Sequence, residues 1–162
     1  MVVPVHINDA QCISEIYNYY VLHSGVTFEE EAISLQDMSE RIKTITQKWP
    51  WLVYKESQNI LGYAYAANWK SRVGYRLTVE ISVYLKHDCY NKGIGSTLYS
   101  ALINKLKEIG VHSVIGGVAL PNPASIRLHE KFGFEKVAHF KDVGIKFEKW
   151  MDVCYWQLQL NS

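Results

Sequence analysis

The sequence predicts a single α+β domain with a mixed, mostly antiparallel central sheet flanked by helices. Two observations predict this class: short runs rich in β-branched and aromatic residues, and segments of helical periodicity that stand between them. The 162 residues are enough for one full core, and they contain no repeat, low-complexity tract or Pro/Gly/Ser linker. We therefore expect one domain over residues 1–162.

The first half of the chain combines two helices with a hairpin. We expect a strand at 2–7, a helix from an Asp9 cap to about Leu22, a helix from Leu35 to about Gln47 capped by Ser34, and strands at 51–56, 60–69 and 76–85. In the last strand, alternate side chains point to opposite faces. Glu80 then shares the polar face with Thr78, Ser82 and Tyr84, opposite Val79 and Ile81.

The second half begins with the clearest helix. An apolar stripe predicts a helix at 94–109 that Gly110 ends. A strand at 112–119 follows, then a short helix that Asn122 and Pro123 begin and that ends near residues 132–133. Two late strands are expected at about 134–141 and 150–160.

The composition excludes several classes of binding partner from our expectations. The 17 basic and 16 acidic residues nearly balance, and no basic run is present, so nucleic acid is not an expected partner. Cys12, Cys89 and Cys154 have no metal-ligand spacing, and we expect reduced thiols and no metal. No signal segment and no run of about 18 apolar residues is found, so we expect a cytoplasmic protein that does not bind membranes.

The most informative short motif precedes the helix at 94–109. Gly93 and Gly95 lie directly after a strand and at the start of that helix, where free backbone N–H groups and the positive helix end can bind an anion. Lys92 would add charge and Ser96 a hydroxyl. Two glycines before a helix are as often a tight turn. The spacing required for a nucleoside-triphosphate or dinucleotide loop is absent.

Several motifs, and their order along the chain, resemble those of the GNAT acetyltransferase superfamily. Within it, the match is closest to the phosphinothricin and methionine sulfoximine acetyltransferases. The matching segments are residues 69–72, 78–96, 121–125, 128–134 and 150–158. The resemblance spans almost the whole chain. It implies the GNAT acyltransferase fold, acetyl-CoA as cosubstrate and a homodimer.

The resemblance also implies cofactor-binding residues. Backbone groups of Val83, Tyr84 and Leu85 would bind the pantetheine arm, and Asn122 and Ser125 would complete the groove. The pyrophosphate would lie on Asn91, Lys92, Gly93, Ile94, Gly95, Ser96 and Thr97. The chain departs from the family pattern at Tyr90, where Gln or Arg is usual three residues before the first glycine.

Two residues are candidates for proton transfer. An amine is mostly protonated at neutral pH, so a carboxylate must accept its proton before the nitrogen attacks a thioester, and Glu80 is the candidate base. The alternative for Glu80 is a solvated carboxylate on an exposed strand face. His129 stands where many GNAT enzymes have a tyrosine that protonates the leaving thiolate, although a helical histidine is more often a surface or hydrogen-bonded core residue.

Three further residues are candidates for acceptor binding. Lys70 and Arg72 lie in the loop before the Glu80 strand, where a cation could pair with an acceptor carboxylate; both could equally be solvated. Phe28 could form a wall of the acceptor pocket or only anchor its loop to the core.

These residues favour transfer of acetyl from acetyl-CoA to the α-amine of a small amino-acid-like acceptor such as phosphinothricin, methionine sulfoximine or methionine sulfone. One alternative is a protein N-terminal or lysine acetyltransferase with an acidic groove, for which residues 29–31, three glutamates, are the only hint. Another is a binding module that senses acyl-CoA without turnover, although retention of Glu80 and His129 argues against it.

Overall fold

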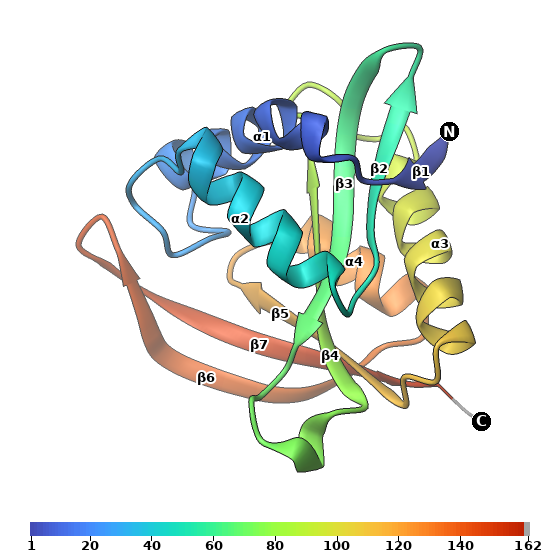
Figure 1. Ribbon diagram of the computed structural model, residues 1–162. Helices are drawn as coiled ribbons and strands as arrows, with labels where there is room; N and C mark the ends of the chain where they lie inside the picture. The colour runs from blue at the N-terminus through green and yellow to red at the C-terminus, as the bar shows by residue number, and fades with distance from the viewer. Residues whose placement is uncertain (161–162) are drawn as a thin grey trace.

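The structure is a computed structural model that describes residues 1–160 (Figure 1). In chain order the elements are β1 (Val2–Pro4), the 3₁₀ turn η1 (Ile7–Asp9), α1 (Ala10–His23), α2 (Leu35–Thr46), β2 (Trp51–Glu56), β3 (Asn59–Asn68), the 3₁₀ turn η2 (Val73–Tyr75), β4 (Thr78–Leu85), α3 (Ile94–Glu108), β5 (Ser113–Ala119), α4 (Pro123–Lys131), β6 (Glu135–Lys146) and β7 (Lys149–Gln159). The predicted α+β class is confirmed.

All strands belong to one seven-stranded sheet in the order β1-β2-β3-β4-β5-β7-β6. Helices cover both faces of this sheet, with α1 and α2 in front in Figure 1. The front face holds an apolar cluster that includes Ile13, Met38 and Tyr63, and the opposite face holds a larger one built around α3 with Leu98 and Leu102. The apolar stripe predicted for residues 94–109 therefore faces the core.

The two faces of β4 separate as the alternation predicted. Val79 and Ile81 belong to the α3 cluster, whereas Tyr84 packs with tyrosines of α1 and β3 on the front face. Helix α1 covers the front face of β4 at Tyr84. Glu80, nearer the start of the strand, is half-buried.

Several local signals produced the expected structure. Ser34 Oγ accepts a hydrogen bond of 3.0 Å from the backbone N–H of Asp37 at the start of α2. The Asn122 side chain accepts one of 3.2 Å from Ser125 N–H at the start of α4. The strand at 51–56 has the predicted bounds.

Other predicted boundaries were wrong. Asp9 does not cap α1 with its side chain; its carboxylate accepts from His6 N–H at 2.8 Å and from Lys55 Nζ at 3.1 Å, so β1 ends at Pro4 and a 3₁₀ turn intervenes. The turn η2 shortens β4 to Thr78–Leu85. Strand β6 continues to Lys146, because an irregularity around Asp142, with φ of 45°, keeps the chain paired with β7.

The feature that positions the site is the junction of β4 and β5, the only parallel pair in the described sheet. Their pairing covers only three register positions, from Thr78↔Ser113 to Glu80↔Ile115, whereas β3 and β4 pair over seven. Beyond Glu80 the two strands separate, and β5 stays paired with β7. One edge of β4 from Ile81 to Leu85 is therefore open.

Within residues 1–160, we searched for membrane-spanning helices and for metal sites. None of the helices there has the length and apolar character needed to span a membrane. No cluster of three or more His, Cys, Asp or Glu side chains in that range is arranged to hold a metal ion.

Candidate active site

A cavity of about 380 Å³ occupies the gap between β4 and β5. Its walls come from the end of β4, the loop before α3, the first turns of α3, strand β5 and helix α4. Of the predicted cofactor residues, it is lined by Val83, Tyr84, Leu85, Asn91, Lys92, Gly93, Ile94, Gly95, Ser96, Asn122 and Ser125, and it also contacts His129. The fold thus brings three separate predicted segments to one cavity.

The loop before α3 has the geometry of an anion cradle. The first intrahelical bond of α3 runs from Thr97 N–H to Gly93 O at 3.0 Å, which leaves the N–H groups of Ile94, Gly95 and Ser96 without helical partners. No side chain caps them. These N–H groups and the positive helix end line the cavity and favour an anionic group there.

The two glycines of the cradle have different roles. Gly93 has φ of 75°, in the left-handed region that strains other residues. A Cβ on Gly95 would make only ordinary contacts, 3.6 Å to the nearest Leu128 atom, so protein packing does not require glycine there. Thr97 lies outside the cavity, because its hydroxyl, like its N–H, bonds Gly93 O.

Only alternate backbone groups of β4 are free toward the cavity. Trp69 N–H bonds Thr78 O and Lys86 N–H bonds Leu61 O, so the even-numbered residues of β4 form the ladder with β3. Val83 and Leu85 therefore direct their N–H and C=O groups to the open edge, where the Leu85 C=O already accepts from the Tyr20 hydroxyl. The backbone of Tyr84 is engaged with β3, so only two of the three predicted residues offer free groups.

Helix α4 brings Asn122, Ser125 and His129 to the cavity. Of these, His129 is the buried residue of α4, at 3% exposure. Its ring packs on β5, and a Cβ on Gly116 would come within 2.3 Å of Nε2.

The protonation of His129 follows from its partners. Nδ1 lies 2.7 Å from the carbonyl oxygen of Ser125, which can only accept, so Nδ1 carries the proton. Nε2 then accepts from the Tyr99 hydroxyl at 3.2 Å. Burial lowers the pKa of His129 below its ordinary 6.5, so the ring is neutral at pH 7. This arrangement does not favour the expected donation of a proton to a thiolate.

Glu80 lies beside the cavity on the front face of the sheet. Its Oε2 is 3.0 Å from the position that a Cβ on Gly117 would take, and Gly117 lines the cavity. Burial raises the pKa of the Glu80 carboxyl, and the charge of Lys70 opposes this increase. Within residues 1–160, Glu80 forms no hydrogen bond or ion pair. Such a carboxylate is a stronger base than a solvated one.

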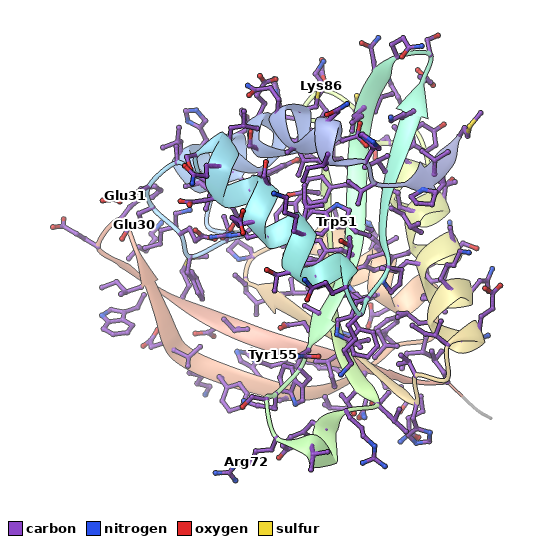
Figure 2. All side chains as sticks on the ribbon, viewed as in Figure 1. Glu30, Glu31, Trp51, Arg72, Lys86 and Tyr155 are labelled. Atoms are coloured by element: carbon purple, nitrogen blue, oxygen red, sulfur yellow. The ribbon has the colours of Figure 1, made fainter. Side chains whose placement is uncertain are left out.

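Of the two cations predicted near Glu80, only Lys70 acts on it. The Lys70 ammonium lies 4.9 Å from the ring of Trp69, which packs edge-on against Tyr155 at 5.4 Å. Figure 2 shows Tyr155 on the sheet and Arg72 on the loop between β3 and β4, with its side chain directed away from the body. Arg72 is exposed.

The loop between α1 and α2 is anchored internally. The ring of Phe28 packs on Gly144, where a Cβ would lie 2.3 Å from it, and Phe28 does not line the cavity. Glu29 binds Arg41 at 2.8 Å, and the carboxylate of Glu30 accepts from the backbone N–H of Phe147 at 3.0 Å. Two of the three glutamates proposed for an acidic groove are therefore engaged within the protein.

Comparison with known proteins agrees with this geometry. Residues 3–155 match the acetyltransferase (GNAT) domain family. The chain belongs to the GNAT acetyltransferase family. This chain is 37% identical to the L-methionine sulfoximine/L-methionine sulfone acetyltransferase of Salmonella typhimurium. The alignment covers 95% of this chain and 91% of the relative. The chain is 35% identical to the phosphinothricin N-acetyltransferase of Streptomyces viridochromogenes, over 95% of its own length and 84% of the relative.

A solved structure supports the same conclusion. The structure of an acetyltransferase from Salmonella typhimurium with its cofactor acetyl-CoA superposes with a TM-score of 0.96 at 34% identity, covering 99% of this GNAT chain and 94% of the other. The predicted GNAT fold is therefore confirmed.

Sequence reasoning missed part of the GNAT site. Tyr20, Tyr99 and Gly117 line the cavity. In the sequence the two tyrosines show only the spacing of an apolar helix face, which does not indicate a binding site. The pair Gly116–Gly117 inside a strand was an available signal, because glycine in a strand interior often marks a close approach. Arg127 and Lys131 of α4 also line the cavity.

Proposed function

We propose that the protein transfers acetyl from acetyl-CoA to the α-amino group of a small amino-acid-like acceptor of the phosphinothricin, methionine sulfoximine or methionine sulfone type. One observation supports the proposal: the cavity joins an anion cradle to a half-buried, unpaired carboxylate across Gly117. Relatives with these named activities support the acceptor class.

The cavity fits acetyl-CoA. The free N–H groups of Ile94, Gly95 and Ser96 would hold the pyrophosphate, and the basic side chains of Lys92, Arg127 and Lys131 add positive charge around it. The open edge of β4 at Val83 and Leu85 would pair with the amides of the pantetheine arm. Bound in this way, the cofactor would have its thioester in the gap between β4 and β5, within reach of the front face.

Glu80 would accept a proton from the acceptor ammonium, directly or through one water, and the free amine would then attack the thioester carbon. A free backbone N–H of Val83 or Leu85 would stabilise the oxyanion. The thiolate would leave without a proton from His129, because thiols with a pKa of about 8.5 are good leaving groups. We assign His129 to holding α4 against β5.

The acceptor carboxylate would bind Lys70. The charge of Lys70 already lowers the pKa of Glu80, and its ammonium lies over the Trp69 ring, whereas Arg72 extends away from the site. An acceptor bound between Lys70 and Glu80 would place its two charged groups on residues of opposite sign. Arg72 would then contribute at most to attraction of the acceptor from solution.

The alternative of a protein acetyltransferase is weaker on structural grounds. Its only support in the sequence was the acidic run at 29–31, and Glu29 and Glu30 make internal contacts that hold their loop. Glu30 and Glu31 are both exposed, and of the three only Glu31 makes no hydrogen bond or ion pair within residues 1–160.

The deciding experiment measures free thiol release from acetyl-CoA with a panel of acceptors. We expect turnover with L-methionine sulfoximine, L-methionine sulfone or phosphinothricin, and little with their N-methylated forms or with peptides. Turnover confined to peptides would favour the protein acetyltransferase. Tight acetyl-CoA binding with no thiol release for any acceptor would favour a sensor and contradict an enzyme.

We also propose a homodimer formed through the late hairpin. Strand β6 is a sheet edge, and large apolar side chains on β6, β7 and their turn are each at least 49% exposed: Val137, Phe140, Val143, Ile145, Phe147 and Trp150. A twofold axis would let this surface cover itself. Sedimentation velocity should give a dimer that Trp150→Glu weakens, and a monomeric wild-type protein would contradict the proposal.

A cytoplasmic location completes the proposal. Cys12, Cys89 and Cys154 are all free thiols, and a reducing compartment keeps such thiols reduced. Fractionation of cells that express the chain would test this location.

A further inference from the structure

Tyr90 occupies the position where related loops carry a side chain able to donate to phosphate. It lies at the cavity wall with its ring half exposed. A phenol could in principle donate one hydrogen bond to a phosphate oxygen. Its actual partner decides whether that proton is available.

The hydroxyl of Tyr90 lies 2.8 Å from the hydroxyl of Tyr20 on helix α1. The Tyr20 hydroxyl also contacts the carbonyl oxygen of Leu85, which can only accept, so Tyr20 is the donor in that bond. The Tyr20 oxygen must then accept from Tyr90. Both phenolic protons are committed, and Tyr90 offers only lone pairs to the cavity, which a phosphate oxygen would repel.

The ionisation of Tyr20 is consistent with this arrangement. Burial and the contact with Tyr90 raise the pKa of Tyr20, so its hydroxyl keeps its proton through the physiological range. The donor and acceptor roles of the pair are therefore stable to pH changes around neutrality.

A second contact joins α1 to the same loop. The rings of Tyr19 and His87 stack with centroids 4.3 Å apart and an angle of 12°. Cys89, between His87 and Tyr90 in the chain, is buried in the core at 5% exposure. The segment 86–93 is thus held by consecutive tyrosines of α1 on one side and by the core on the other.

The loop has a conformation that needs such support. Asn91 and Gly93 both have positive φ, 62° and 75°, and a non-glycine residue in this region has a conformational cost. Without contacts that oppose this cost, the loop would sample other conformations, and its N–H groups would not converge on one point.

We propose that Tyr20 and Tyr90 are positioning residues: their hydroxyl pair holds the 86–93 loop and the Leu85 carbonyl in the arrangement that binds acetyl-CoA, and Tyr90 does not bind phosphate itself. The inference rests on the proposed cofactor site. It replaces a direct phosphate contact with pre-organisation of the backbone cradle. The pair connects two segments that the cofactor would touch, the end of β4 and the loop before α3.

The test uses Tyr90→Phe, Tyr20→Phe and the double variant of the full chain. Tyr90→Phe removes one hydrogen bond and should weaken acetyl-CoA binding, measured by calorimetry, about two- to tenfold. Tyr20→Phe also removes the bond to the Leu85 carbonyl and should weaken binding at least as much. The double variant should bind no more weakly than the weaker single variant, because both changes break one pair. Hydrogen exchange of residues 86–93 in the ligand-free protein should be faster in all three.

Tyr54→Phe is the matched control. Tyr54 lies half-buried on β2, and its hydroxyl makes no hydrogen bond within residues 1–160, so binding and exchange should stay at wild-type values. Thermal unfolding of each variant identifies any that is merely destabilised. Tyr90→Phe should fold normally, because its ring is half exposed.

Two results would overturn the inference. Suppose that Tyr90→Phe weakens acetyl-CoA binding, that Tyr20→Phe binds as the wild type does, and that hydrogen exchange of residues 86–93 is unchanged. Tyr90 then contacts the cofactor directly. If neither single variant changes binding or exchange, the pair has no positioning role. Failure of the wild-type protein to bind acetyl-CoA would contradict the proposed function instead, and exchange in the free protein would still test the pair.

Discussion

Replacement of Glu80 by Gln tests the chemistry and the fold together. The amide has nearly the shape of the carboxylate but no negative charge, and it cannot accept the ammonium proton. General-base catalysis contributes about 10²- to 10⁴-fold, so kcat/KM at pH 7 should fall by an amount in that range. The loss should shrink at high pH, where the acceptor amine is already deprotonated.

The same substitution should stabilise the protein. Burial raises the pKa of Glu80 above its ordinary 4.5, so the charged form is less favourable in the native state than in the unfolded state. The wild-type protein therefore loses stability as the pH rises through the raised pKa, and the Gln variant does not. The variant should unfold at a higher temperature at pH 8, and this advantage should diminish as the pH falls toward 4.5.

Steady-state thiol release from pH 6 to pH 10, with thermal unfolding over pH 5 to pH 8, measures both effects. Glu56→Gln is the matched control, because Glu56 is exposed at the end of β2 and does not line the cavity. A loss of activity that does not depend on pH would show that Glu80 is not the base. A lower unfolding temperature for Glu80→Gln would show that its carboxylate has a stabilising partner.

Three further outcomes are expected. Lys70→Ala should raise KM for a carboxylate-bearing acceptor more than for its methyl ester, whereas Arg72→Ala should raise it little; equal effects on acid and ester would exclude Lys70 from carboxylate binding. Gly117→Ala places a Cβ 3.0 Å from the Glu80 Oε2, so further desolvation should move the acidic limb of the pH profile of kcat/KM upward. Gly116→Ala forces a Cβ to 2.3 Å from the imidazole on α4 and should lower the free energy of unfolding by about 1–3 kcal/mol, measured by urea denaturation; wild-type stability would contradict that packing.

The prediction for Arg72 shows a limit of sequence reasoning. Lys70 and Arg72 are two residues apart in one loop, and nothing in the sequence separates their roles. The course of the loop through the turn η2 leaves the lysine beside Trp69 and directs the arginine into solvent. A side chain's direction in an irregular loop depends on backbone angles that local pattern does not specify.

His129 illustrates the same limit on a helix. It follows Asn122 by seven residues and Ser125 by four, so helical spacing brings all three residues to the cavity. Burial, however, depends on what packs against the helix, and β5 has glycine at residue 116 where the ring enters. The partner strand therefore decides that this histidine is neutral and buried.

The sequence alone determined the fold class and most element positions, and it predicted either an anion cradle or a tight turn at Gly93–Gly95. These features depend on periodicity, capping and turn residues within a few positions of each other. Only the tertiary structure decided the separation of β4 from β5, the open edge at Val83 and Leu85, and the Tyr20–Tyr90 pair. These features join residues far apart in the chain, and no local pattern encodes which partner each will meet.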